Sequence, residues 1–169
     1  METLKSKLDQ IKEICTTEFL IPFEGTGPRD SQGNFLAYRD PGSKDGLPIT
    51  IAWGLTFDIQ GNPFQLGDKL GYEQALSIKQ AVLNKFLAEL IKLSPKIVLE
   101  PSRRIAAVLS WCYNCGLGNY MASTFRRKVN AGEWQEAAEQ CLKWDKSNGK
   151  VMRGLTRRRQ AEAKAILNP

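Results

Sequence analysis

Histidine is absent from this chain of 169 residues. Its absence excludes Ser-His-Asp and Cys-His catalysis, zinc sites built on imidazole, and imidazole as a general acid or base. Proton transfer near neutral pH is then left to carboxyl, phenol or lysine side chains whose protonation is shifted by their surroundings. The search for chemistry therefore turns to the acidic residues.

Long apolar segments are also missing, since no run approaches the ~20 residues that a transmembrane helix needs. The first residues, Met1 to Lys5, lack the apolar core and the small-residue cleavage site of a secretory signal. We therefore expect synthesis in the cytoplasm without stable insertion in a membrane, and release by another route if the protein acts elsewhere. A hydrophobic content of 42% and a charged content of 25% are ordinary for a globular domain.

Cysteine occurs only four times, at positions 15, 112, 115 and 141. The spacing of Cys112 and Cys115 is that of a redox pair or of half a metal site, but a second CxxC motif and a preceding strand are missing. Cysteine is common as a small buried residue, and disulfides are not expected in a cytoplasmic chain of this size. We interpret the cysteines as packing residues and expect neither a metal nor a cofactor.

Acidic residues are scarce only towards the C-terminus. Residues 120–169 contain 11 basic and 5 acidic side chains, whereas residues 1–119 are balanced, so the net charge of +6 lies in the last fifty residues. A basic segment predicts an anionic partner such as nucleic acid, phospholipid or a cell-wall polymer, although charge alone favours a solvated helix face. Basic and aromatic residues are not interleaved as in nucleic-acid-binding segments, so we expect no nucleic-acid partner.

The N-terminal third mixes one helix with short strands. Apolar residues at helical spacing predict a helix over 3–19, which Pro22 should end. Residues 25–34 have the composition of a loop. Two short strands, from Phe35 to Tyr38 and from Ile49 to Trp53, predict a small hairpin.

The remainder is helical. A broad apolar face predicts a long helix from Tyr72 to about Leu93, after which Pro95 and Pro101 break the chain. Further helices are predicted over 102–115, from Ser123 and Thr124 through Val129, over 133–144 and over 153–167, with a turn at Asn148 and Gly149. The predicted fold class is α+β and mostly α, in one domain over 1–169. It has a small β-containing lobe at about 20–70, a connecting helix at about 72–93, and a helical lobe at about 95–169 that packs with the first helix.

The β-containing lobe holds two acids on turn-rich backbone. Glu24 follows the end of the first helix and the apolar residues 21–23, a setting that favours the protonated acid. Asp40 lies beside Arg39 and before a polar turn at 41–42, so it should stay ionised. One protonated and one ionised carboxyl group can cleave a glycosidic bond by proton transfer. The alternative is a solvated pair of surface acids.

Thr50 lies between Ile49 and Ile51 on the second predicted strand, so its hydroxyl faces away from these two apolar side chains. A fixed hydroxyl near an aspartate can hold a water molecule for attack. The preference of threonine for strands is the alternative explanation of this residue.

Four ordered blocks of sequence carry a further signal. They are Phe23-Glu24-Gly25 with Ala37-Tyr38-Arg39-Asp40-Pro41-Gly42 and Thr50-Ile51-Ala52-Trp53-Gly54-Leu55-Thr56, then Tyr113-Asn114-Cys115-Gly116, then Ser123-Thr124-Phe125-Arg126-Arg127-Lys128-Val129-Asn130, and finally Gly154-Leu155-Thr156-Arg157-Arg158-Arg159 with Glu162. Together they resemble the phage-type lysozymes, the endolysins of glycoside hydrolase family 24. The resemblance covers nearly the entire chain in the right order.

The resemblance implies a lysozyme-like fold and a muramidase. Its reaction would be hydrolysis of the β-1,4 bond between N-acetylmuramic acid and N-acetylglucosamine in bacterial peptidoglycan, for phage-driven lysis of the host cell. Glu24 would be the general acid, Asp40 the carboxylate that activates water, and Thr50 the residue that steadies this water. Inversion at the anomeric carbon would require ~6.5–9.5 Å between the two carboxyl groups.

The resemblance also implies residues that bind the substrate. Thr56, Tyr113 and Thr124 match positions that line the family's cleft, although packing explains Tyr113 and helix capping explains Thr124 at least as well. Ala52 stands where the family often has glycine, which would tighten this strand.

The sequence departs from the family pattern around the second acid. Fifteen residues separate Glu24 from Asp40 and nine separate Asp40 from Thr50, both longer than is usual in the family. Asp30 or Asp45 can therefore take the role of Asp40. We prefer Asp40 because it lies within the matching block.

The partners follow from the same resemblance. We expect a monomer that acts on peptidoglycan after release from the host cytoplasm, with a holin as an export route. The basic C-terminal lobe, including Arg157, Arg158 and Arg159, would hold the enzyme on the polyanionic wall in a salt-sensitive way. The rival functions are a lytic transglycosylase, which needs the glutamate alone, and a non-catalytic protein that binds cell wall or nucleic acid.

Overall fold

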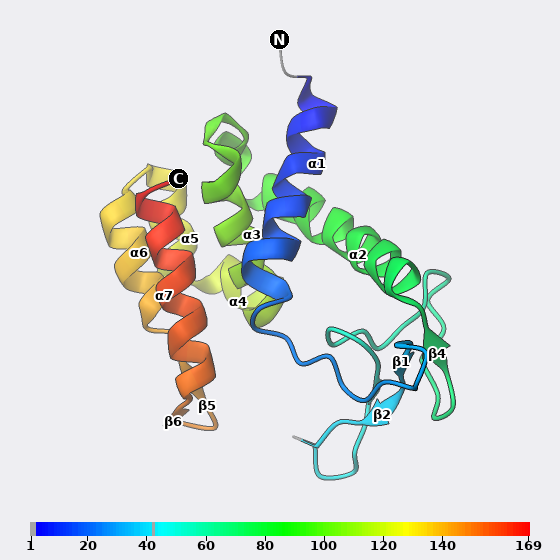
Figure 1. The fold of residues 1–169 in the computed structure, drawn as a ribbon. Coiled ribbons are helices and arrows are strands. Elements are labelled where there is room, and N and C mark those ends of the chain that lie inside the picture. Colours follow the sequence, from blue (N-terminus) through cyan, green and yellow to red (C-terminus); the bar gives the residue numbers. More distant parts are fainter. Residues whose placement is uncertain (1–2, 42) are drawn as a thin grey trace. The chain divides into compact units, whose positions relative to one another are not determined.

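The computed structural model describes residues 3–41 and 43–169 (Figure 1). Gly42, predicted to lie in the turn after Asp40, is outside the described residues, as are Met1 and Glu2. The chain divides into two compact units: a β-containing unit, Glu24–Val82, and a helical unit formed by the residues before and after it. Within the described residues, no helix combines the length and the apolar character that crossing a bilayer requires.

The helical unit consists of short helices and one hairpin. Its elements are α1 (Leu4–Ile14), the π-helix η1 (Cys15–Leu20), the second part of α2 (Tyr72–Leu93), the 3-10 helix η2 (Pro95–Leu99), α3 (Ser102–Cys115), α4 (Leu117–Ala122), α5 (Thr124–Ala131), α6 (Trp134–Leu142), the strands β5 (Lys146–Ser147) and β6 (Lys150–Val151), and α7 (Arg153–Leu167). The helices that the sequence predicts are confirmed. The sequence does not predict η2 and α4, because five or six residues are too few to display a helical period.

Capping hydroxyl groups set the start of two helices. The hydroxyl of Thr3 accepts a hydrogen bond from the backbone N–H of Ser6 at the start of α1. The hydroxyl of Ser123 accepts one from the N–H of Arg126 at the start of α5. Ser123 is therefore the N-cap, and capping does not explain Thr124.

The core of the helical unit surrounds α3. Its residues 105–112 are buried, and all of them except Ser110 belong to one cluster with apolar side chains of α1, η1 and α7. The Trp111 ring centroid lies 5.9 Å from that of Tyr120, 5.0 Å from that of Phe125 and 4.9 Å from that of Trp144. Aromatic contacts of this kind add to the stabilisation that burial itself provides. Helices α6 and α7 run side by side in the same unit (Figure 1).

The β-containing unit has two separate strand pairs, both antiparallel. They are β1 (Phe35–Leu36) with β4 (Lys69–Leu70), and β2 (Tyr38–Arg39) with β3 (Ile49–Thr50). The prediction of one strand from Phe35 to Tyr38 is wrong, because the chain changes partner at Ala37. The N–H of Ala37 donates to the carbonyl of Asp68 at 3.0 Å. The predicted hairpin is confirmed as β2–β3.

The second predicted strand, from Ile49 to Trp53, ends earlier than expected. After Thr50 the chain turns, because Ala52 has a φ of 49° and Gly54 a φ of 77°. Both values lie in the left-handed region, where a residue with a β-carbon is strained by about 1–2 kcal/mol. Glycine would adopt the conformation of position 52 without this strain, whereas the chain has Ala52 there.

The core of the β-containing unit is aromatic. The ring centroid of Trp53 lies 5.1 Å from that of Phe35 and 5.3 Å from that of Tyr72. Lys79 of α2 is fully buried in this unit, and its Nζ donates to the carbonyl of Trp53. A buried ammonium group therefore anchors the backbone of the turn that follows β3.

Two loops of the β-containing unit share one construction. In residues 30–34 and 58–62 the first residue is an aspartate, which accepts hydrogen bonds from the N–H groups of the third and fifth residues and from the final asparagine amide. These bonds lower the pKa of Asp30 and Asp58, and the asparagine side chain is the largest cause. Both carboxylates therefore serve to hold their loops.

Candidate active site

Glu24 lies in the turn that follows the first helical segment, as the sequence predicts, and it is half-buried. Its carboxylate oxygen Oε2 lies 3.4 Å from the point where a β-carbon on Gly54 would stand. The carboxyl group therefore approaches the backbone of the turn that follows Thr50.

Asp40 and Thr50 are brought together by the hairpin β2–β3. Tyr38 of β2 is the cross-strand partner of Thr50 in β3. Asp40 follows β2 directly, and its N–H donates to the carbonyl of Gly46 at 3.1 Å, which closes the loop between the two strands. Thr50 shares one face of the hairpin with Tyr38, its cross-strand partner, and Asp40 lies two residues after Tyr38 in the chain. Arg39, which lies between them in the chain, is exposed.

The phenol of Tyr38 connects the two acids electrostatically. Burial raises the pKa of Tyr38 above its ordinary value, and the negative charges of Asp40 and then Glu24 raise it further. Because electrostatic interaction weakens with distance, both carboxyl groups lie near this one phenol. The fold thus gathers two acids that are well separated in the chain.

Thr50 has a defined hydroxyl orientation. It is 8% exposed, and its hydroxyl donates to the carbonyl of Pro48 at 3.1 Å. A threonine oxygen that donates its proton still has lone pairs to accept hydrogen bonds. Thr50 can therefore accept a hydrogen bond from a water molecule.

The two alternative acids hold their own loops. Asp45 is exposed and accepts hydrogen bonds from the hydroxyl of Ser43 at 2.6 Å and the N–H of Leu47 at 3.0 Å. These bonds, the serine bond first, lower the pKa of Asp45. Asp30 is bound by the donors of its loop in the same manner. Asp30 and Asp45 therefore have structural roles, and the choice of Asp40 as the second acid stays a prediction.

Sequence reasoning missed Lys79, which supports the backbone beside the acids. Its bond to the carbonyl of Trp53 holds the turn that Glu24 approaches. Lys79 lies four residues after Ala75, a buried residue of the same helix. Residues at this spacing share a helix face, and this was the signal available in the sequence.

The three predicted substrate-binding residues fall in different units. Thr56 is a half-buried residue of the β-containing unit. Tyr113 and Thr124 belong to the helical unit, where the Tyr113 ring centroid lies 5.3 Å from that of Phe86. The hydroxyl of Thr124 accepts a hydrogen bond from Nη2 of Arg127 at 2.7 Å. Substrate binding by all three stays a prediction.

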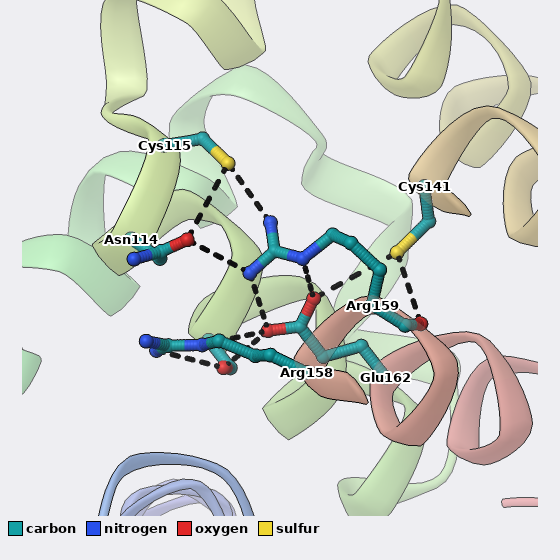
Figure 2. A network of polar contacts seen from close by, with 7 residues as sticks. Asn114, Cys115, Cys141, Arg158, Arg159 and Glu162 are labelled. Atoms are coloured by element: carbon teal, nitrogen blue, oxygen red, sulfur yellow. Dashed lines mark hydrogen bonds and ion pairs between the residues drawn. The ribbon is translucent and has the colours of Figure 1, made fainter. Parts of the chain in front are cut away.

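The three consecutive arginines do not form the exposed cationic surface that the sequence predicts. Arg157 is exposed, but Arg158 is 3% exposed and Arg159 is 0% exposed. Figure 2 shows both buried guanidinium groups directed at Glu162, which is itself fully buried. The prediction is wrong for Arg158 and Arg159, because Glu162 lies four and three residues further along the same helix face.

This buried cluster is held together by several short contacts. Nε of Arg159 lies 3.0 Å from Oε2 of Glu162, and Nε of Arg158 lies 3.3 Å from Oε1. The hydroxyl of Ser110 donates to the same Oε1 at 2.6 Å, and Nη2 of Arg159 donates to Oδ1 of Asn114 at 2.9 Å. Burial raises the pKa of Glu162, while the two guanidinium charges oppose this change. The cluster ties α7 to α3.

The cysteines are free thiols, and three of them are buried. Burial raises the pKa of Cys112 and Cys141 well above the usual range, so both thiols stay protonated. Cys115 is half-buried, and its sulfur accepts a hydrogen bond from Nη1 of Arg159 at 2.9 Å (Figure 2). The packing interpretation is confirmed for the buried cysteines. In the described parts of the chain, no group of three or more metal-ligating side chains could hold a metal ion.

Known proteins are similar to this chain both in sequence and in fold. Residues 32–162 match the family described as phage lysozyme. The chain is 31% identical over 148 residues to a SAR-endolysin of Enterobacteria phage P21, covering 84% of this chain and 82% of that one. The solved endolysin from Escherichia coli O157:H7 phage FAHEc1 has a TM-score of 0.70 and 30% identity, over 96% of this chain and 90% of that chain. A P22 lysozyme mutant, with a TM-score of 0.64 and 22% identity over 99% of each chain, shares the fold.

The fold therefore defines a glycoside hydrolase of the lysozyme type, mostly helical with small antiparallel strand pairs. The chain belongs to the phage lysozyme family. It is an endolysin-type muramidase, which hydrolyses the β-1,4 bond between N-acetylmuramic acid and N-acetylglucosamine in bacterial peptidoglycan during phage-driven lysis.

Proposed function

We propose that Glu24 and Asp40 are the acid and the base of this hydrolysis. Glu24 protonates the glycosidic oxygen as its bond to the anomeric carbon breaks. Asp40 accepts a proton from the water that attacks the anomeric carbon, and Thr50 accepts a hydrogen bond from the same water. The observation that carries the proposal is geometric: Asp40 directly follows the strand in which Tyr38 pairs with Thr50, and Glu24 approaches the turn that follows Thr50.

The stereochemical outcome that we propose is inversion. In this mechanism the two carboxyl groups lie ~6.5–9.5 Å apart, which leaves room for the attacking water. A hydroxyl that accepts a hydrogen bond from water is useful in this arrangement, since the water must be held in one orientation. The orientation of Thr50, which donates to Pro48, supports this role.

Substrate contacts and cellular setting belong to the same proposal. Thr56 is proposed as a substrate contact in the β-containing unit, and Tyr113 and Thr124 in the helical unit, on the strength of the sequence resemblance. The protein is proposed to be a monomer made in the host cytoplasm, with a holin as its route to the wall. Its phage relatives are endolysins, which supports action on the host wall.

The assignment of the acids is tested by lysis of a purified wall suspension with Glu24→Gln, Asp40→Asn and Asp45→Asn. The first two variants should lose about 10²–10⁴-fold in rate, because each loses a proton-transfer group. The lysis rate of Asp45→Asn should stay within about twofold of the wild-type rate, since the Asp45 carboxylate holds the turn in which it lies. An inactive Asp45→Asn with an active Asp40→Asn would show that the second acid is wrong, while the enzyme class stands.

The products test the reaction itself. Hydrolysis leaves a reducing muramic acid end, whereas a lytic transglycosylase leaves an anhydro-muramic end, and mass spectrometry of the muropeptides separates them. Inversion predicts that the α-anomer appears first when a soluble oligosaccharide is followed by NMR. Initial formation of the β-anomer would contradict inversion but leave the hydrolase assignment intact.

A further inference from the structure

The hairpin face proposed for catalysis carries one more polar side chain, the phenol of Tyr38. Tyr38 and Asp40 are two residues apart, with Asp40 directly after the end of β2, and Thr50 is the cross-strand partner of Tyr38. Cross-strand partners have β-carbons about 4.5–5.5 Å apart, so the two side chains are neighbours. Tyr38 therefore stands beside both residues that are proposed to handle the water.

The ring of Tyr38 is fixed against the backbone of Gly27. A β-carbon at position 27 would overlap Cε1 of the ring and would lie 2.6 Å from Cδ1. Gly27 also has a φ of 67°, a conformation that favours glycine. Position 27 thus requires glycine for two reasons, its positive φ and its close contact with the ring. Because glycine has no β-carbon, the ring of Tyr38 can pack directly on the backbone.

The environment of this phenol keeps its proton in place. Partial burial and the charges of Asp40 and Glu24 all disfavour the phenolate, and they raise the pKa of Tyr38. A protonated phenol can donate one hydrogen bond, whereas an ionised carboxylate can only accept. Tyr38 is therefore a hydrogen-bond donor near Asp40, whose carboxylate oxygens can accept.

We infer that Tyr38 is a positioning residue for the carboxyl pair. Its ring is held by Gly27, and its neutral phenol donates a hydrogen bond to the carboxylate of Asp40 in the working enzyme. This bond keeps the carboxylate turned towards the water beside Thr50. The inference rests on the proposed function of Glu24 and Asp40.

The test compares Tyr38→Phe with Tyr72→Phe, which removes the same atom from the same unit. The ring of Tyr72 packs against Trp53 and Phe35, with centroids 5.3 Å and 6.5 Å away, so the control retains its packing. The values of kcat and KM are measured on soluble peptidoglycan fragments between pH 4 and pH 9. Glu24→Gln is included to monitor the proposed function.

Loss of the donor predicts a specific set of changes. In Tyr38→Phe, kcat should fall about 10–100-fold with KM within about twofold, because the bond orients a reacting group without binding the sugar. The acid limb of the pH–rate profile should move upwards, because a hydrogen bond donated to a carboxylate favours its ionised form. Tyr72→Phe should match the wild type in kcat and in pH profile.

The outcomes separate the two proposals. A Tyr38→Phe enzyme with wild-type kcat and pH profile, alongside an inactive Glu24→Gln, overturns the inference and leaves the proposed function standing. An active Glu24→Gln overturns both. If Tyr38→Phe does not fold, ultraviolet titration of the phenols replaces it: Asp40→Asn should lower the pKa of Tyr38, and an unchanged titration overturns the inference.

Discussion

The carboxylate oxygen Oε2 of Glu24 lies 3.4 Å from the position that a β-carbon on Gly54 would occupy. Gly54 has a φ of 77°, so a side chain there would be strained as well as placed against the proposed general acid. The glycine therefore gives the turn its shape and leaves room for the carboxyl group of Glu24.

Gly54→Ala is expected to lower the free energy of unfolding by about 1–2 kcal/mol and to reduce lytic activity at least about tenfold. Gly33→Ala is the matched control, because Gly33 has a φ of 84° and nothing within 4 Å of its β-carbon position. The control should show the same loss of stability in urea unfolding and retain its activity. Equal activity in the two variants would show that the contact with Glu24 has no role.

Lys79→Met should destabilise the β-containing unit, because the carbonyl of Trp53 loses its buried donor. The expected decrease in the free energy of unfolding is about 1–3 kcal/mol. Lys85→Met removes an exposed lysine from the same helix and serves as the control, with an expected change below about 0.5 kcal/mol. Urea unfolding followed by tryptophan fluorescence measures both variants. Identical midpoints would contradict an anchoring role for Lys79.

Glu162→Gln removes the charge that balances two buried arginines. Breaking a buried ion pair by removing one partner costs about 3–5 kcal/mol, because the remaining charges stay buried without compensation. Glu136→Gln, at an exposed position of α6, should be nearly neutral. Calorimetry of the two variants tests the difference. Equal melting temperatures would mean that the cluster does not stabilise the helical unit.

Salt should slow wall lysis because it screens the charges of exposed basic residues. The buried arginines should not contribute to this effect. The double variant Arg153→Gln with Arg157→Gln removes two exposed charges of α7, and its lysis rate should depend less on salt than that of the wild type. A double variant at the exposed Lys44 and Lys85 loses the same charge elsewhere and should retain the wild-type dependence. Lysis rates between 20 and 500 mM salt, about the range over which screening changes most, make the comparison. Equal slopes in all three proteins would exclude attraction through α7.

Low pH should destabilise the loop that the hydrogen bonds of Asp58 hold. Hydrogen bonds, that of Asn62 first, lower the folded-state pKa of Asp58 below its ordinary value. The stability contributed by Asp58 is therefore present above the unfolded-state value of about 3.9 and is lost as the pH falls through the lower folded-state value. Asp58→Asn should melt at a lower temperature at pH 7 and show a flatter decline from pH 5 to about pH 2. Glu73→Gln, at an exposed position of the same unit, should follow the wild-type curve.

The candidate site was partly predictable from the chain. Glu24, Asp40 and Thr50 were predicted because acids on turn-rich backbone and a threonine in a strand are recognisable residue by residue, and their catalytic roles stay predictions. The roles of Asp30 and Asp45 were not, because their hydrogen bonds depend on the exact path of two loops. The structural roles of Asp30 and Asp45 could therefore be read only from the fold.

By itself the sequence determined the positions of the helices and the order of the candidate acids along the chain. The long helix is predicted from Tyr72 to about Leu93 and is found as Tyr72–Leu93, because helical period and chain breakers act over a few neighbouring residues. Only the tertiary structure decided that Arg159 is buried against Asn114, 45 residues away, and that the chain changes strand partner at Ala37. These outcomes depend on contacts between distant segments. Such contacts produce no periodic pattern in the local sequence from which they could be predicted.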